Sequence, residues 1–182
     1  MSVRTKLWTR DEYDRLVAAG AFHAEARVQL VQGEIVEMTP QSAAHAAAVE
    51  LAQGALQAAF GSRYFVRVQL PLALGEDSEP EPDLAIVAEP PRTRTSRHPT
   101  TAVLVVEVAD TTLDFDRSRK RELYARAQIP EYWIVNLVAG MLEVSRDPQG
   151  STYRTALHLK PGEAIAPLTT PATALRISDL LP

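Results

Sequence analysis

Cysteine is absent from the 182 residues of this chain. Its absence excludes disulfide bonds, thiolate zinc sites and catalysis by a cysteine nucleophile. A chain without cysteine suits the reducing cytoplasm, and we expect this protein to be cytoplasmic.

Long apolar segments are also missing. The longest apolar runs, such as AVLVVEVA at residues 102–109, are much shorter than the roughly 20 residues that a membrane-spanning helix needs. The N-terminal sequence MSVRTKLWTRDEYDRL lacks the apolar core of a signal peptide. We therefore expect a soluble protein without a targeting signal and without a membrane partner.

The chain has no excess of positive charge. Its 19 basic and 23 acidic residues give a formal net charge of −4, so contact with nucleic acid would have to come from local basic patches. The basic residues cluster at two places, namely Arg92, Arg94 and Arg97, and Arg117, Arg119 and Arg121 around Lys120. Each cluster could contact phosphates or form a solvated surface, and the sequence does not rank these alternatives.

Several catalytic motifs are missing. The two closest glycines, Gly54 and Gly61, are seven residues apart, which excludes the glycine-rich loops of nucleotide-binding proteins and the GxSxG elbow of serine hydrolases. The four histidines, at positions 23, 45, 98 and 158, do not have the spacing of zinc ligands. Zinc hydrolase chemistry therefore has no support in the sequence.

The length and the apolar content predict one domain over residues 1–182, because 46% hydrophobic residues can form one substantial core. Capping, alternation and turn patterns predict, in chain order, a helix at 9–19, a hairpin at 28–38 around Gln32-Gly33, a helix at 42–60, strands at 64–70, 83–88 and 102–109, a helix at 117–127, and strands at 131–137, 140–147 and 151–159, with turns at 138–140 and 147–150. Short connections favour antiparallel pairing of the three middle strands. We expect an α/β (α+β) fold with a mixed, mostly antiparallel central sheet flanked by helices.

The strands at 83–88 and 102–109 carry the first candidate site residues. If these strands pair antiparallel, a symmetric register places Asp83 opposite Glu107 on the same face. Two adjacent carboxylates repel each other unless a hard cation lies between them, which makes the pair the simplest oxygen-ligand site for magnesium. Alternatively, Asp83 ends a turn and Glu107 ends a strand at the solvent. Glu107 favours a site, because it interrupts an apolar run where an unpaired charge is costly.

A lysine in the following helix is the third candidate. Lys120, Leu123, Tyr124 and Ala127 have the i, i+3, i+4, i+7 spacing of one helix face. Lys120 therefore shares the apolar, sheet-facing side, and we expect it to point back toward the strand ends. The alternatives are a surface pair with Asp116 at i, i+4 spacing, or a lysine stem lying over the core.

Two carboxylates on a metal and one lysine suit the hydrolysis of a phosphodiester. The metal lowers the pKa of a bound water and neutralises the phosphate, and the lysine orients the attacking hydroxide or stabilises the developing negative charge. We therefore predict catalytic roles for Asp83, Glu107 and Lys120. Asp83 and Glu107 would also bind Mg²⁺, which Mn²⁺ could replace.

These residues lie in segments that resemble the PD-(D/E)XK nucleases and, more closely, the Uma-two family of restriction-endonuclease-like proteins. The resembling segments are LVQGEIVEM, EPEPDLAIV, LVVEVADTTLDFDRSRKRELYARAQIPEYWIV and the closing strands. The resemblance implies a restriction-endonuclease-like core and a metal-dependent deoxyribonuclease, in which Asp83 is the first acid and Glu107 the second.

One position departs from the superfamily pattern, which has a lysine two residues after the second acid. That position is Ala109 here, and the resemblance implies that Lys120 takes over the role. Glu34 and His45 lie in family-like segments and are second-tier candidates, Glu34 as an extra metal or water contact and His45 as a helix-borne polar group. The alternatives are a solvated hairpin residue for Glu34 and a capping or surface residue for His45.

The leading hypothesis is a magnesium-dependent endonuclease that hydrolyses DNA, and a two-fold homodimer is the simplest assembly for cutting both strands of a duplex. Two hypotheses compete with it: a nuclease-fold protein that binds or assembles without cutting, and a metal-dependent phosphodiesterase that acts on small nucleotides. Arginines of the 92–97 segment next to Asp83 would favour DNA. The same segment turned away from Asp83 would favour the other two.

Overall fold

A six-stranded sheet forms the centre of the protein. The computed structural model describes residues 3–23 and 25–182, and in it the strands follow the order β3-β4-β5-β6-β7-β8. Of the neighbouring pairs, β5 and β6 are parallel and the others are antiparallel. The strands are β3 (Phe65–Val68), β4 (Leu84–Val87), β5 (Leu104–Ala109), β6 (Glu131–Asn136), β7 (Met141–Gln149) and β8 (Thr152–Leu159). The predicted mixed, mostly antiparallel sheet is confirmed.

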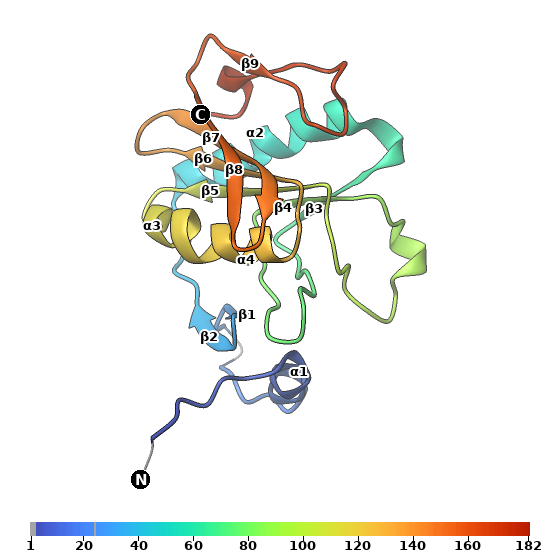
Figure 1. Cartoon of the computed structure of the whole chain (residues 1–182), viewed down its shortest axis with the longest axis vertical. Coiled ribbons are helices and arrows are strands. Elements are labelled where there is room, and N and C mark those ends of the chain that lie inside the picture. The colour runs from blue at the N-terminus through green and yellow to red at the C-terminus, as the bar shows by residue number, and fades with distance from the viewer. Residues whose placement is uncertain (1–2, 24) are drawn as a thin grey trace.

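Helices cover both faces of this sheet (Figure 1). One face packs on the long helix α2, and the other packs on a continuous helical segment between β5 and β6. These helices are α2 (Ala43–Phe60), α3 (Leu113–Phe115), the π-helical turn η3 (Asp116–Lys120) and α4 (Arg121–Arg126). Neighbouring residues of β5 alternate between the two layers, since Val106 belongs to the core under α2 and Val105 to the core under α4. In the part of the chain that the structure describes, no helix is both long and apolar enough to cross a membrane.

The N-terminal part forms a small unit beyond the α4 side of the sheet (Figure 1). It consists of α1 (Arg10–Ala18) and the hairpin of β1 (Val28–Val31) and β2 (Glu34–Glu37). Thr9 and Glu12 form the predicted capping box of α1. The turn residues Gln32 and Gly33 both have positive φ, as a two-residue hairpin turn requires. A Cβ at Gly33 would lie 2.8 Å from the Cβ of Leu7, so a larger residue would clash there.

The C-terminal segment covers the α2 side of the sheet. The strands β9 (Ala164–Ile165) and β10 (Leu175–Arg176) pair with each other, and the short turn η4 (Ile177–Asp179) follows. Ile165, Leu175 and Ile177 are buried in the same core as α2. Two further 3-10 turns are η1 (Gly61–Arg63) and η2 (Pro91–Thr93).

Two details of the predicted strands are wrong. The turn predicted at 147–150 is strand over 147–149, because β7 continues to Gln149 and only Gly150 and Ser151 connect it to β8. Beyond Arg146, β7 pairs with β8 alone, and at such an edge Pro148 is tolerated. The strand predicted at 64–70 ends at Val68.

Candidate active site

The register of β4 and β5 brings Asp83 and Glu107 together. Leu84 pairs with Val106, so Asp83, which directly precedes β4, lies opposite Glu107, as the symmetric register predicted. The backbone N–H of Asp83 donates a hydrogen bond of 3.4 Å to Glu107 Oε2. Only 8% of Asp83 and 2% of Glu107 are exposed to solvent. The alternative that placed Glu107 at the solvent is therefore wrong.

Asp83 is held by groups from three elements. Its Oδ2 accepts a hydrogen bond of 2.9 Å from the backbone N–H of Val108 and lies 3.2 Å from His45 Nε2, while its Oδ1 accepts from Gln69 Nε2 at 3.3 Å. Burial raises the pKa of Asp83, but His45 and the Val108 N–H outweigh it and hold the pKa below its usual value. Asp83 is therefore ionised at neutral pH.

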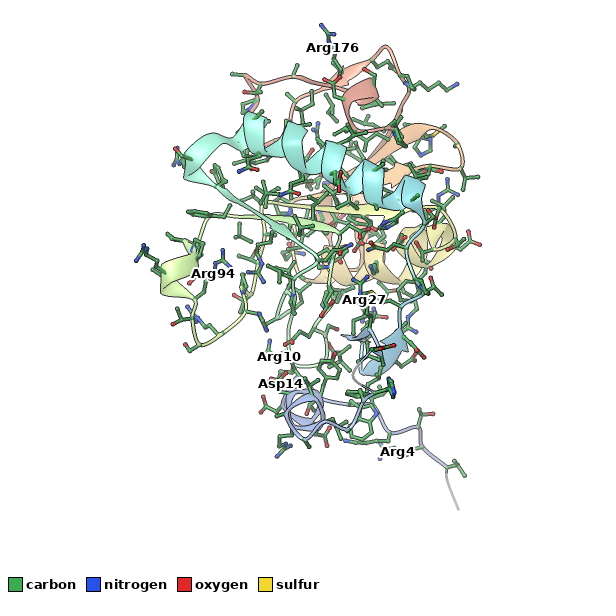
Figure 2. The ribbon with its side chains drawn as sticks, turned by 180° about the vertical axis from the view of Figure 1, so that it is seen from behind. Arg4, Arg10, Asp14, Arg27, Arg94 and Arg176 are labelled. Carbon is green, nitrogen blue, oxygen red and sulfur yellow. The ribbon has the colours of Figure 1, made fainter. Side chains whose placement is uncertain are left out.

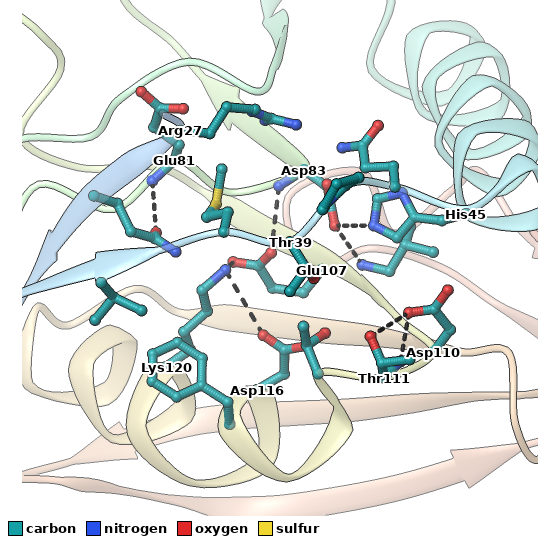
Figure 3. Close-up of a pocket in the computed structure, with 18 of the residues that line it drawn as sticks. Arg27, Thr39, His45, Glu81, Asp83, Glu107, Asp110, Thr111, Asp116 and Lys120 are labelled. Atoms are coloured by element: carbon teal, nitrogen blue, oxygen red, sulfur yellow. Dashed lines mark hydrogen bonds and ion pairs between the residues drawn. The ribbon is translucent and has the colours of Figure 1, made fainter. Parts of the chain in front are cut away.

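Glu107 is paired with Lys120 inside the protein (Figure 3). Lys120 Nζ lies 2.9 Å from Glu107 Oε1, and the hydroxyl of Tyr124 donates to the same oxygen at 2.7 Å. Burial raises the pKa of Glu107, and Lys120 opposes that effect only in part. Burial lowers the pKa of Lys120, but Glu107, Asp116 and Asp83 outweigh burial, so that pKa lies above its usual value.

The π-helical turn η3 directs Lys120 toward the sheet. The backbone N–H of Arg121 bonds to the carbonyl of Asp116, five residues back, and this wide turn leaves both Asp116 and Lys120 buried, with Nζ 3.7 Å from Asp116 Oδ1. Single π turns of this kind are frequent at functional sites. The predicted inward direction of Lys120 is confirmed, and its pairing with Asp116 occurs as well, in the interior and not at the surface.

His45 lies in the first turn of α2 and is 8% exposed. Ser42 caps this helix by accepting from the His45 backbone N–H, and its own hydroxyl donates to Asp110 Oδ2 at 2.8 Å. The start of α2 is thereby tied to the residues after β5, which aims the imidazole at Asp83. Burial lowers the pKa of His45, but Asp83 outweighs it and raises the pKa overall. The alternative of a surface residue is wrong for His45.

Glu34 is not brought to the Asp83–Glu107 pair. It opens β2, its side chain is 53% exposed, and it forms an ion pair of 2.6 Å with Arg119 Nη1. It is also absent from the lining of the pocket next to the pair. These contacts correspond to the solvated alternative for this residue.

A pocket of about 220 Å³ opens beside the pair (Figure 3). Its lining comes from the β2 end and the following segment, from the start of α2, and from the residues around β4, β5 and η3. Its charged residues are Arg27, Glu37, His45, Glu81, Asp83, Glu107, Asp110, Asp116 and Lys120. The pocket therefore carries more carboxylates than cationic groups.

Sequence reasoning missed several of these residues. Asp116 entered only as a surface partner of Lys120, and Tyr124 only as an apolar helix position, although their spacing from Lys120 was visible. Gln69 and Asp110 were missed because their contacts with Asp83 and Ser42 are long-range. No local pattern in the sequence indicates such contacts.

The donor groups fit a magnesium ion with few protein ligands. Within the described residues, no group of three or more His, Cys, Asp or Glu side chains has the arrangement of a metal site. Glu107 Oε2 has only the long contact with the Asp83 N–H, and Asp83 Oδ1 only the bond from Gln69. Magnesium keeps several waters and is often bound by one or two carboxylates together with substrate phosphates. Two carboxylate oxygens facing a pocket satisfy that requirement.

Comparison with known proteins identifies the family and the fold of this chain. The Uma2 (Uma-two) family, described as "Putative restriction endonuclease", matches residues 10–178. A crystal structure from Anabaena variabilis, titled as that of "a putative nuclease belonging to DUF820", has a TM-score of 0.74, covers 94% of this chain and 96% of its own, and is 15% identical. At this identity the likeness shows a shared fold. No curated protein matches the chain in sequence.

Proposed function

Because this chain belongs to the Uma2 family of restriction-endonuclease-like proteins, we propose that it is a metal-dependent endonuclease that hydrolyses phosphodiester bonds of DNA. One observation carries the proposal: two buried carboxylates meet at the pocket and a buried lysine lies 2.9 Å from one of them. Metal-dependent hydrolysis of a phosphodiester uses carboxylates that bind the metal and a cation that stabilises charge on the phosphate. A surface that only binds a neutral partner has no need of these buried charged groups.

Asp83 and Glu107 would hold a divalent cation, Mg²⁺ or Mn²⁺, whose chemistry is to lower the pKa of a bound water and to neutralise phosphate charge. Asp83 would use Oδ1, because Val108 and His45 occupy Oδ2. Glu107 would use Oε2, because Lys120 and Tyr124 occupy Oε1. Each carboxylate thus has one oxygen with two close partners and a second oxygen with one longer contact, 3.3 Å for Asp83 Oδ1 and 3.4 Å for Glu107 Oε2.

Lys120 would act as a cation and not as a base. Its raised pKa keeps the ammonium charged at neutral pH, so it can stabilise the negative charge that develops on the phosphate. Ala109 occupies the strand position of the usual lysine. The Lys120 ammonium instead reaches Glu107 from η3, the helical turn that follows β5. This position supports the role of Lys120 as the cation that stabilises the phosphate. His45 and Tyr124 would position Asp83 and Glu107.

The experiment combines metal titration with plasmid nicking. Asp83→Asn and Glu107→Gln should each weaken Mg²⁺ or Mn²⁺ binding at least about tenfold and reduce nicking on the order of 1000-fold. Lys120→Met should keep the metal and lose at least about 100-fold of the nicking rate. Glu34→Gln, which removes an exposed carboxylate outside the pocket, is the matched control and should retain both.

The assembly follows from the same assay. Linear product formed in a single encounter indicates a two-fold dimer with two sites, and nicked product alone indicates one site per encounter. If the wild-type protein binds neither metal at millimolar concentration and nicks no plasmid, the nuclease proposal is wrong. A nuclease-fold binding protein then takes its place. Hydrolysis of small nucleotides without nicking would establish the phosphodiesterase alternative.

A further inference from the structure

The edge strand β3 carries a buried arginine that has no acidic ion-pair partner among residues 3–23 and 25–182. Arg67 is only 7% exposed, and its Nη2 donates to the carbonyl of Pro71 at 3.0 Å. Its Nε has no hydrogen-bond partner among the described residues. Burial lowers the pKa of Arg67, and the neighbouring charge that adds to this effect is another cation, Arg94. A buried guanidinium in such surroundings lacks the counter-ion that normally offsets its desolvation.

Arg67 and Arg94 line the same pocket. This pocket has a volume of about 590 Å³ and lies along β3, between the end of α2 and η2. Ser62, Tyr64 and Gln57 contribute polar groups to it, and no aspartate or glutamate is among its lining residues. The pocket therefore has the opposite charge character to the one beside Asp83.

Arg94 approaches from a separate segment of the chain. It follows η2, at the side of the molecule next to the sheet edge (Figure 2). Its Nε donates to the carbonyl of Glu89 at 3.0 Å, and its side chain is half-buried. This bond fixes the guanidinium through a neutral group, so its positive charge remains available. Two guanidinium groups that line one pocket suit an oxyanion, because their planar forks match the geometry of phosphate.

The pocket shares no lining residue with the pocket beside Asp83, but the two are connected through neighbouring strands of the sheet. Arg67 pairs with Ala85, and a cross-strand pair shares one face of a sheet. Asp83 lies two residues before Ala85, which corresponds to roughly 7 Å along the strand. Phosphates of one strand of a duplex follow one another about every 3.4 Å along its axis. A polynucleotide with one phosphate at Asp83 can therefore present another phosphate, a few nucleotides away, to Arg67.

We propose that Arg67 and Arg94 form a phosphate-binding subsite, which takes a backbone phosphate of the nucleic acid that the Asp83 site would cut. The phosphate oxygens would accept from the guanidinium groups of Arg67 and Arg94, with the Ser62 hydroxyl as an additional donor. The assignment to nucleic acid rests on the proposed function. The affinity for phosphate as such does not.

The first arm of the test uses inorganic phosphate and the unfolding temperature of the metal-free protein. Phosphate should raise the melting temperature of the wild type, and this shift should be lost in Arg67→Gln and in Arg94→Gln. Arg92→Gln, which removes an arginine of the same segment that does not line the pocket, should keep it. Because Arg67 is buried, Arg94→Gln decides the question if Arg67→Gln does not fold. Absence of the shift in the wild type, or its persistence in Arg94→Gln, overturns the subsite.

The second arm measures binding of a labelled DNA duplex by fluorescence anisotropy in calcium, over a range of salt concentrations. Arg94→Gln should weaken binding about tenfold and reduce the salt slope by about one, while Arg92→Gln should leave both close to wild type. Loss of the phosphate shift with unchanged DNA affinity would overturn the nucleic-acid assignment and leave free phosphate as the source. A protein that fails to nick plasmid but passes the phosphate arm would overturn the proposed function and not this subsite.

Discussion

Two glutamates on neighbouring strands, Glu107 of β5 and Glu131 of β6, are both buried but differ in how their oxygens are used. Glu131 Oε1 accepts from Arg146 and Trp133, and its Oε2 accepts from the backbone N–H of Leu168 at 2.8 Å. Glu107 has its Oε1 occupied and its Oε2 nearly free, next to a pocket. A buried carboxylate therefore suggests chemistry only when one of its oxygens is left without a fixed partner.

The largest effect expected is on activity, at Glu107. Glu107→Gln keeps the side-chain shape and the possible contact with Tyr124 but removes the charge. It should reduce nicking on the order of 1000-fold, about 4 kcal/mol in activation free energy. The free energy of unfolding should change by less than about 1 kcal/mol, because one charge leaves a cluster of three carboxylates. Plasmid nicking and urea unfolding of the same preparations measure both quantities, and a large loss of stability would make Glu107 equivalent to Glu131.

The reverse pattern is expected at Glu131. Glu131→Ala leaves Arg146, the Trp133 indole N–H and the Leu168 N–H without their shared acceptor, and it should lower the free energy of unfolding by about 3 kcal/mol. Urea unfolding measures this loss. At a temperature where the variant is folded, nicking should stay within about twofold of wild type. A variant that is stable and inactive would contradict the structural role assigned to Glu131.

A third buried carboxylate, Glu79, extends the comparison to pH. Its partners are distant, with Arg10 Nε at 3.9 Å and His98 Nε2 at 4.0 Å, and burial followed by repulsion from Asp14 raises its pKa to about 7. Since this pKa is higher in the folded than in the unfolded state, the folded state binds the proton more tightly. The resulting stability is present below the unfolded pKa and is lost as the pH rises through about 7.

The free energy of unfolding should accordingly fall by about 2 kcal/mol between pH 5 and pH 8 through this group. Glu79→Gln should flatten that part of the profile, as measured by urea unfolding at a series of pH values. Asp14→Asn is a milder variant that should shift the decline to lower pH, because it removes a charge that raises the pKa of Glu79. A profile that is the same in Glu79→Gln and in the wild type would show that Glu79 titrates in its ordinary range.

The smallest effect is expected at His45, which touches a candidate ligand but not the pocket's open oxygens. His45→Gln should reduce nicking about tenfold, because Asp83 loses one of the groups that position it and keep its pKa low. Added metal should restore part of the rate if the loss is one of metal affinity. His23→Gln, which changes an exposed histidine distant in the sequence from His45, serves as the control. Equal rates for the two variants would exclude a positioning role for His45.

The sequence predicted the pairing of Asp83 with Glu107 because two short strands joined by one loop allow few registers, and residue parity then assigns the faces. The inward direction of Lys120 followed from helical periodicity. The contact of the His45 ring with Asp83 could not be predicted, since it depends on the hydrogen bond between Ser42 and Asp110, which are far apart in the chain. The failure at 147–150 has the opposite origin: Asp-Pro-Gln-Gly is typical of a turn, but pairing with β8 outweighed that local preference.

The sequence also could not distinguish Glu107 from Glu131 by their charge. Glu107 was a candidate site residue because it interrupts an apolar run. Glu131 is buried as well, since it opens a strand that is buried throughout. Both glutamates satisfy the rule that a buried charge needs a partner. Their difference lies in which partners they found, and this is a property of tertiary packing that residue types in sequence do not encode.

The π-helical turn at Asp116–Lys120 has a consequence for insertions and deletions. A π turn contains about one residue more than an α turn. Deleting one residue from 117–119 would let the segment form an ordinary α-helix, in which three α-helical steps replace the four steps of the wider π turn between Asp116 and Lys120, and the position of the lysine relative to Glu107 would change. The direction of this side chain therefore depends on the number of residues in the segment as much as on their identity. A change of length there would move the Lys120 ammonium relative to Glu107 without changing any other residue of the pocket.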